Sequence, residues 1–259
     1  MVHSGHRERW MRATAIEFRL RMAIMAVVIA SGFWAPWIEG WGVGQRISLL
    51  EWLALELSRL GLVPFAVATP LVIVAAALVA AAGAALRVWG TAWLGTGTVN
   101  NLRMKAGVLL ADGPYRYVRN PLYIGSWCMV AAMGFLMPAT GALFVMVLLT
   151  AFLLRLIFGE EAFLAGQLGE PYRAYLRAVP RLIPRVRTAL MPTGRKPHWL
   201  HALLAEINPI GIFLILAAMS WSYDNRLMIR AIIVSFGISL VVRALNYSAE
   251  NAPPEPSAD

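Results

Sequence analysis

Residues 65–86 read FAVATPLVIVAAALVAAAGAAL, a run of 22 residues without a charged side chain. An α-helix of this length is about 33 Å long, enough to cross the roughly 30 Å hydrocarbon core of a bilayer. The whole 259-residue chain agrees with this assignment, since only 14% of its residues are charged, against about a quarter in soluble domains. Its mean hydropathy is +0.63. The sequence therefore predicts an all-α, polytopic membrane helix bundle.

Five further apolar segments lead us to expect about six transmembrane helices. They are residues 22–38, 121–138, 141–158, 209–223 and 227–242. An Arg-rich segment precedes the first of them without an obvious cleavage site, so we interpret that span as retained rather than as a signal peptide. Leucines at helical spacing predict an amphipathic helix over residues 47–62, on the outer surface or against the bundle.

The distribution of positive charge predicts the orientation of the chain. If the N-terminus is cytoplasmic, four of the 23 Lys and Arg residues fall outside, namely Arg46, Arg59, Arg226 and Arg230, and the other 19 fall inside. Cytoplasmic loops carry such an excess. We therefore expect both termini to be cytoplasmic, in a bacterial inner (plasma) membrane.

We expect three regions along the chain. Residues 1–64 hold the N-terminal segment, the first span and the amphipathic helix. Residues 65–188 form a core, and residues 189–259 hold an interfacial helix, a transmembrane hairpin and a tail. The single cysteine, Cys128, excludes a disulfide framework or Cys-based zinc site within one chain. We expect no metal, because His198 and His201 have no third ligand nearby. We expect no nucleic-acid partner, because topology accounts for the basic residues.

Residues 113–125 (GPYRYVRNPLYIG) place two Arg, three Tyr and two Pro at the start of an apolar run. Interface anchoring explains part of this pattern. It does not explain why Tyr115, Arg119 and Tyr123 are spaced by four, which on a helical path would put them on one face. The residues alone leave an interface anchor and a ligand site equally open.

The acidic pair Glu160-Glu161 follows two apolar runs later, on the same predicted side of the membrane. Two acids at the C-terminal end of a helix repel each other and oppose the helix dipole. They therefore indicate partner cations, such as Arg155 or Arg119, or a ligand with hydroxyl, amine or sulfonium groups. The later run GEPYRAYLRAVPRLIP, residues 169–184, favours an interfacial anchor over direct chemistry.

Four motifs in this order resemble the isoprenylcysteine carboxyl methyltransferase family, which belongs with the membrane phospholipid methyltransferases. They are Gly-Pro-Tyr-x-x-x-Arg-Asn-Pro-x-Tyr-x-Gly from 113, Glu-Glu-x-x-Leu from 160, Gly-x-x-Tyr-x-x-Tyr from 169 and Val-Pro-Arg-x-Ile-Pro from 179. The resemblance covers about residues 65–185. It implies an integral-membrane methyltransferase that uses S-adenosylmethionine at the cytosolic face and takes a lipophilic or lipid substrate from the bilayer.

The resemblance also implies functional positions. The residues that would line the cofactor pocket are Asn100, Gly107, Val108, Leu109, Leu110, Tyr115, Asn120, Pro121, Leu122, Tyr123 and Glu160. The residues that would order the site or meet the substrate, and that we assign as catalytic, are Arg119, Tyr123 and Glu161.

Two positions depart from the family pattern. Asn120 stands where the family often has His, and an amide can bind but cannot titrate near neutrality. Leu156 stands where the isoprenylcysteine enzymes place an Arg for the substrate carboxylate, with Arg155 next to it. One residue along a helix rotates a side chain by about 100°, so a prenylcysteine carboxylate is less well supported as the acceptor.

We expect methyl transfer by in-line displacement to the carboxylate or thiol of an isoprenoid-like or other small hydrophobic molecule. A carboxylate or a thiolate is already ionised and needs no base. One alternative is a phospholipid amine N-methyltransferase. Another is a non-enzymatic membrane scaffold or transporter subunit, which the scarcity of charged residues within the spans disfavours.

Overall fold

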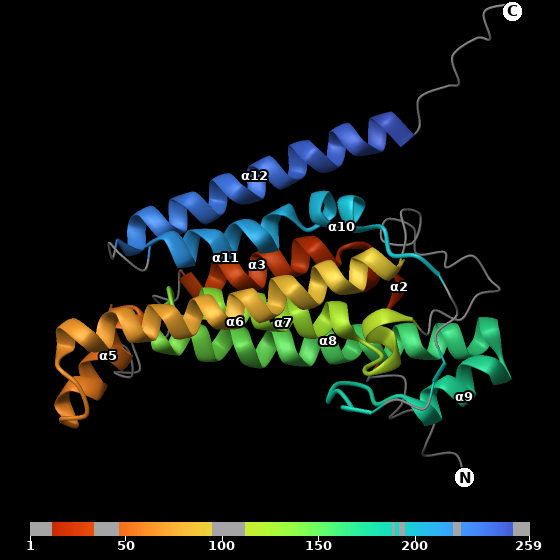
Figure 1. Cartoon of the computed structure of the whole chain (residues 1–259), viewed down its shortest axis with the longest axis horizontal. Helices are drawn as coiled ribbons and strands as arrows, with labels where there is room; N and C mark the ends of the chain where they lie inside the picture. The colour runs from red at the N-terminus through yellow and green to blue at the C-terminus, as the bar shows by residue number, and fades with distance from the viewer. Residues whose placement is uncertain are drawn as a thin grey trace, which may run out of the picture.

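The structure, a computed structural model, describes residues 12–33, 47–94, 112–187, 190–191, 195–219 and 224–250. In these residues every regular element is helical, so the expected all-α class is confirmed. The elements are α2 (Ala15–Arg19), α3 (Arg21–Phe33), α5 (Leu49–Arg59), α6 (Phe65–Leu94), the 3₁₀ helix η1 (Gly113–Arg116), α7 (Pro121–Gly134), α8 (Ala139–Leu168), α9 (Glu170–Ala178), α10 (Trp199–Ala205), α11 (Ile207–Met219) and α12 (Asn225–Glu250) (Figure 1).

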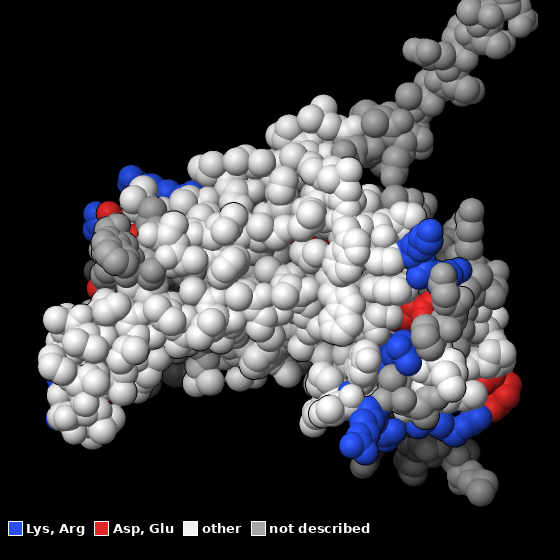
Figure 2. All heavy atoms as spheres, in the orientation of Figure 1, with Lys and Arg blue, Asp and Glu red and all other residues white. Residues whose placement is uncertain are grey.

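The longer helices run along the long axis of the molecule (Figure 1). Neighbours pack in the order α3, α8, α7, α6, α11 and α12. The helix α5 lies at one end, and α9 lies at the other. In the view of Figure 2 the coloured charged side chains gather toward the two ends and leave the middle of this face almost free of charge, as expected of a bundle that sits in a bilayer.

Two helices, α6 and α8, are long and apolar enough to cross a membrane, and α10 with α11 could form a third span with a 69° bend. Each of the six predicted segments contains a helix, but α3 and α7 have only 13 and 14 residues. Six membrane-spanning helices are therefore not confirmed among the described residues. The division into residues 1–64, 65–188 and 189–259 stays a prediction.

The helices α6 and α8 continue beyond the ends of the predicted membrane segments at residues 86 and 158. For α8 this agrees with the expectation that the chain after Phe158 begins as a continuation of the fourth span. In the folded chain the charged side chains beyond these ends have partners: Arg87 on α6 binds Glu206, and Glu161 on α8 binds Arg119. Both helices can therefore extend to Leu94 and Leu168, which brings their ends to the site described below.

Buried side chains form two main clusters, one on each side of α7. The first joins α5, α6, α7, α11 and α12 around Ile73, Leu136 and Leu216. The second joins α7 and α8 around Leu149 and Leu156. Such clusters stabilise the fold by removing apolar surface from water.

Glycines allow α6 and α7 to approach closely. A Cβ atom on Gly83 of α6 would lie 2.9 Å from the carbonyl oxygen of Gly125 on α7. The close approach holds the first turn of α7 against α6.

The predicted amphipathic helix is confirmed as α5, and it packs against the bundle. Ser48 caps it, since its hydroxyl accepts a hydrogen bond from the Glu51 N–H at 3.2 Å and its own N–H donates to the Glu51 carboxylate at 2.9 Å. This reciprocal pair is a capping box. Leu50 and Ala54 are fully buried.

Candidate functional site

The segment Gly113-Pro114-Tyr115 folds into the 3₁₀ turn η1 against the end of α6. Gly113 has φ +56°, a left-handed conformation that glycine adopts without strain. A Cβ atom here would collide with the ring of Trp93. The turn therefore needs glycine both for its backbone and for its contact, and it buries Tyr115.

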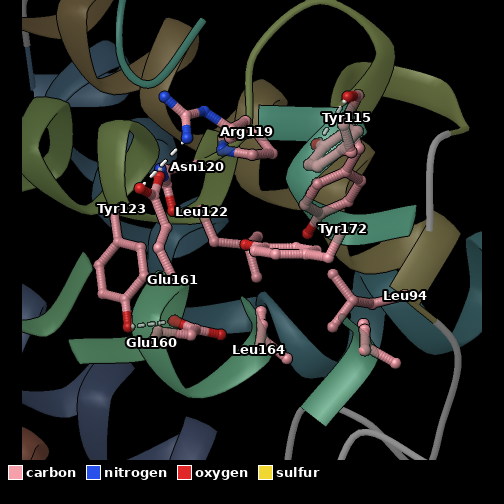
Figure 3. Close-up of a pocket in the computed structure, with 13 residues that line it drawn as sticks. Leu94, Tyr115, Arg119, Asn120, Leu122, Tyr123, Glu160, Glu161, Leu164 and Tyr172 are labelled. Atoms are coloured by element: carbon pink, nitrogen blue, oxygen red, sulfur yellow. Dashed lines mark hydrogen bonds and ion pairs between the residues drawn. The ribbon is translucent and has the colours of Figure 1, made fainter. Parts of the chain in front are cut away.

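The turn, α6, α7, α8 and α9 enclose a cavity of about 110 Å³ (Figure 3). Its lining residues are Leu94, Tyr115, Arg119, Asn120, Pro121, Leu122, Tyr123, Glu160, Glu161, Leu164, Leu168, Tyr172 and Tyr175. Leucines form one part of this lining, and tyrosines with charged side chains form the other. A ligand that fits it must have both apolar and polar parts.

Glu160 and Tyr123 face each other in the cavity (Figure 3). The Tyr123 hydroxyl donates a hydrogen bond of 2.8 Å to Oε2 of Glu160. The contact joins the first turn of α7 to α8 and presents a carboxylate beside an aromatic ring.

Glu161 has a different environment, although it is the next residue. Its Oε2 accepts hydrogen bonds from Nε and Nη2 of Arg181, at 3.0 and 2.8 Å, and lies 3.2 Å from Nη1 of Arg119. Its Oε1 accepts a hydrogen bond of 3.1 Å from the side-chain amide of Asn120. Glu161 is only 6% exposed, and a buried carboxylate is tolerated when it is paired in this way.

The chain after α9 is joined to the turn before α7 by backbone hydrogen bonds. The N–H of Arg119 donates to the carbonyl of Pro180 at 2.9 Å, and the N–H of Arg185 donates to the carbonyl of Tyr117 at 3.0 Å. Asn120 also donates to the carbonyl of Arg181 at 3.2 Å. This segment therefore lies against Arg119 and Asn120, two residues of the cavity lining.

Three tyrosines complete the cavity wall. The Tyr175 hydroxyl donates to the carbonyl oxygen of Tyr115 at 2.9 Å, and the rings of Tyr172 and Tyr175 lie 5.7 Å apart. Burial raises the pKa of each of the three phenols above its usual value. All three are therefore protonated at neutral pH and can donate a hydrogen bond rather than act as bases.

Two buried polar atoms of the lining residues have no hydrogen-bond partner, the hydroxyl oxygen of Tyr115 and Nε of Arg119. The pKa of Arg119 is lowered from its usual value, mainly because the guanidinium is buried. A buried donor without a partner costs about 1–3 kcal/mol. Both groups are therefore donors that a ligand with hydrogen-bond acceptors could use.

The structure brings eight predicted site residues together at this cavity: Tyr115, Arg119, Asn120, Pro121, Leu122, Tyr123, Glu160 and Glu161. The other predicted positions, Asn100, Gly107, Val108, Leu109 and Leu110, lie outside the described residues. Tyr115, Arg119 and Tyr123 do share the cavity, but not one helix, because Arg119 lies between η1 and α7.

Sequence reasoning missed part of the lining. Leu164 and Leu168 follow Glu160 and Glu161 by one and two turns of α8, so helical spacing could have identified them. Tyr172 and Tyr175 stood in a recognised motif but were interpreted as interfacial anchors. Arg181, from the same motif, proves to be a main partner of Glu161.

Arg155, the other cation suggested for the acidic pair, is bound elsewhere. Its Nη2 donates to both carboxylate oxygens of Glu17 at 3.0 Å. Leu156 beside it is fully buried. Within the described residues, no group of three or more His, Cys, Asp or Glu side chains is placed to hold a metal ion.

A comparison with protein families finds that residues 64–170 match the phospholipid methyltransferase model. The matched segment includes α6, η1, α7 and α8, and thus most of the cavity lining. Tyr172, Tyr175 and the helices α10 to α12 follow it. No curated protein and no solved structure matches the chain.

Proposed function

We propose that this chain transfers a methyl group from S-adenosylmethionine to a lipophilic acceptor. The premise is that residues 64–170 belong to the phospholipid methyltransferase family, within the isoprenylcysteine and phospholipid methyltransferases. The family resemblance predicted from the motifs is thereby confirmed. A membrane methyltransferase that acts on lipid-like substrates follows from the family. The cofactor, the acceptor and the roles of individual residues are our proposals.

The observation that carries the proposal is the two-sided cavity between the ends of α6 and α8. Leu94, Leu164 and Leu168 give it an apolar wall, and Tyr123, Glu160 and the Arg119–Glu161 pair give it a polar wall. A polar cofactor and a lipophilic acceptor need walls of these two kinds next to each other.

The polar wall fits the groups of S-adenosylmethionine. The carboxylate of Glu160 suits ribose hydroxyls or an ammonium group, since an ionised carboxylate only accepts hydrogen bonds. The Tyr115 hydroxyl and Nε of Arg119, both buried without a partner, suit a carboxylate or a ring nitrogen. When bound, the cofactor supplies an electrophilic methyl group on a sulfonium.

The residues of the chain would then align the acceptor with the methyl group and keep water out of the site. Aromatic faces attract cations, so Tyr123 and Tyr172 are suited to hold a sulfonium. Glu161 is fixed by Arg119, Arg181 and Asn120. We therefore propose that it holds the side chains of the site in place and does not transfer a proton. Arg119 is the residue we expect to meet an anionic acceptor.

We propose a carboxylate or thiol as the acceptor, because the described lining contains no histidine and its tyrosines stay protonated. A carboxylate would have to bind at Arg119, because Arg155 is bound to Glu17. The second candidate is a phospholipid amine, which the family match itself suggests. The bacterial inner membrane and cytoplasmic termini stay predictions.

Calorimetry on the full-length protein in detergent tests the cofactor. We expect S-adenosylmethionine to bind, and absence of binding at millimolar concentrations would overturn the proposal in favour of a scaffold or transporter subunit. Transfer of a labelled methyl group to prenylcysteines, small hydrophobic thiols and phospholipids then distinguishes the acceptors. Label found only in phospholipid would establish the amine alternative.

A further inference from the structure

The seven residues after Pro180, Arg181-Leu-Ile-Pro-Arg-Val-Arg187, form what we call the strap. It contains exposed apolar side chains outside any helix: Ile183 is 81% exposed and Val186 is 95% exposed. Exposed apolar residues scattered singly are ordinary. Here they alternate with arginines in one short segment, which requires an explanation.

The strap holds these side chains outward. Its backbone is tied to the turn before α7 through Arg185 N–H to the Tyr117 carbonyl at 3.0 Å. The guanidinium of Arg181 is fixed on Glu161 and lies 4.5 Å from the centre of the Phe158 ring. Ile183 lies between these two ties and Val186 directly follows the second, and both side chains are exposed.

The surroundings of the strap are basic. Residues 171–187 include five arginines and no acid: Arg173, Arg177, Arg181, Arg185 and Arg187. Glu170 partly neutralises the two on α9. Figure 2 shows Lys and Arg side chains gathered at this end of the molecule.

The strap also points in the direction that a membrane contact needs. In Figure 1 the chain after α9 folds back in the direction of the middle of the bundle rather than away from it. The start of α10 lies at the same end of α6 as the cavity, because His198 N–H donates to the Ala92 carbonyl at 2.8 Å. Trp199 and Leu200, which follow, are also exposed, and Trp is enriched at membrane interfaces.

We propose that the strap is a lipid-binding element, in which Ile183 and Val186 enter the interface of an anionic bilayer and Arg185 and Arg187 contact lipid phosphates. Apolar side chains next to basic ones bind such surfaces through burial and through attraction to anionic headgroups. Arg181 of the strap binds Glu161 of the cavity lining, so the lipid surface would hold the strap beside the cavity. This proposal rests on the membrane setting of the chain and not on methyl transfer.

The test places an environment-sensitive fluorophore on the strap of the full chain. The Ile183→Cys substitution is made in a Cys128→Ser background, so that the label has one site, and Glu170→Cys on exposed α9 gives the matched control. Both proteins are reconstituted in phosphatidylcholine vesicles with and without phosphatidylglycerol, together with lipids that carry a spin-label quencher.

We expect severalfold stronger quenching at position 183 than at position 170 in vesicles with phosphatidylglycerol, and weaker quenching at 183 in high salt. Replacing Arg185 and Arg187 by Gln should reduce quenching to the level in phosphatidylcholine alone, whereas replacing Arg173 and Arg177 by Gln should not. Equal quenching at both positions would overturn the proposal and leave the strap open to a protein partner. Quenching that is independent of anionic lipid would overturn the role of the arginines.

A cofactor titration on the same vesicles keeps the two proposals separate. Quenching at position 183 without cofactor binding would support the strap and contradict the methyltransferase assignment. Cofactor binding without quenching would do the reverse.

Discussion

Two adjacent glutamates have different partners because successive residues of a helix point about 100° apart. Glu160 meets the hydroxyl of Tyr123, while Glu161 meets two arginines and an amide. Only the first arrangement gives the carboxylate a neutral hydroxyl, rather than a cation, as its hydrogen-bond partner at the cavity. At the scale of the residue, we therefore assign ligand binding to Glu160 and the stabilisation of the site to its neighbour Glu161.

This division predicts the effect of two substitutions on cofactor affinity. Glu160→Gln removes a charged hydrogen-bond acceptor, which contributes about 1.5–3 kcal/mol, so the Kd for S-adenosylmethionine should rise roughly tenfold to a hundredfold. Tyr123→Phe should raise it by a smaller factor. Calorimetry measures both, with Glu170→Gln on exposed α9 as the control. An unchanged Kd in a folded Glu160→Gln variant would contradict the assignment.

The Glu17–Arg155 pair predicts a pH dependence of stability. The hydrogen bond from Arg155, followed by the bond to the backbone of Thr14, lowers the pKa of Glu17. A carboxyl group with a lowered pKa in the folded state stabilises it above the unfolded pKa, about 4.3 for Glu, and loses that contribution as the pH falls through the folded pKa.

We therefore expect wild-type protein to melt at a higher temperature than the Glu17→Gln variant at pH 6–7, with a difference that shrinks below about pH 4. Thermal unfolding in detergent across this range measures it. The Glu56→Gln variant on α5, whose partner Arg59 is exposed, is the control. A difference that persists undiminished at low pH would show that the ion pair is not its source.

At the scale of the element, the strap and the turn before α7 form one unit around Glu161. Two arginines bind the same carboxylate oxygen, but they differ in burial: the Arg119 side chain is 11% exposed, and that of Arg181 is 38% exposed. Partial exposure weakens an ion pair because water and salt screen it.

We expect Arg181→Met to loosen the strap while the bundle stays folded. The remaining Arg119 pair keeps Glu161 neutralised, so the loss in unfolding free energy should be about 1 kcal/mol or less. Limited trypsin digestion should nevertheless cut after Arg185 and Arg187 severalfold faster than in the wild type. Arg173→Met removes an equally basic but weakly paired side chain and is the control. Equal cleavage rates in both variants would contradict the role of Arg181.

At the scale of the whole molecule, one buried network joins the C-terminal helices to the family domain. Glu206, which is 1% exposed, accepts from Nε and Nη2 of Arg87 at 2.6 and 3.0 Å and from the hydroxyl of Thr91 at 2.7 Å. Arg87 also donates to the hydroxyl of Ser126 on α7 at 2.6 Å. The network therefore links α6, α7 and the end of α10.

Loss of one partner from this network should be costly. Glu206→Leu leaves Arg87, whose side chain is 19% exposed, without its carboxylate, and breaking a fully buried pair in this way costs at most about 3–5 kcal/mol. The double variant Arg87→Met/Glu206→Leu replaces both charges by apolar groups and should recover much of that loss. Thermal unfolding in detergent measures the two variants. A double variant no more stable than Glu206→Leu would show that the pair stabilises the fold in some other way.

The sequence by itself determined the helices and most of the cavity lining. Apolar runs and leucine spacing are local patterns, and they placed α5, α6 and α8 before any contact was known. The order of the motifs gave the family and eight residues that the structure brings to one cavity. Local pattern suffices here because backbone hydrogen bonds in a bilayer must be satisfied within the helix itself.

Only the tertiary structure decided which charges meet. Glu161 pairs with Arg181, twenty residues away, Arg155 with Glu17, and Arg87 with Glu206 across 119 residues. Two of these pairings give partners to charged side chains, Arg87 and Glu161, that lie beyond the predicted membrane segments on α6 and α8. The physical reason is that a buried charge is tolerated only beside a partner, and the fold brings that partner from a distant part of the chain.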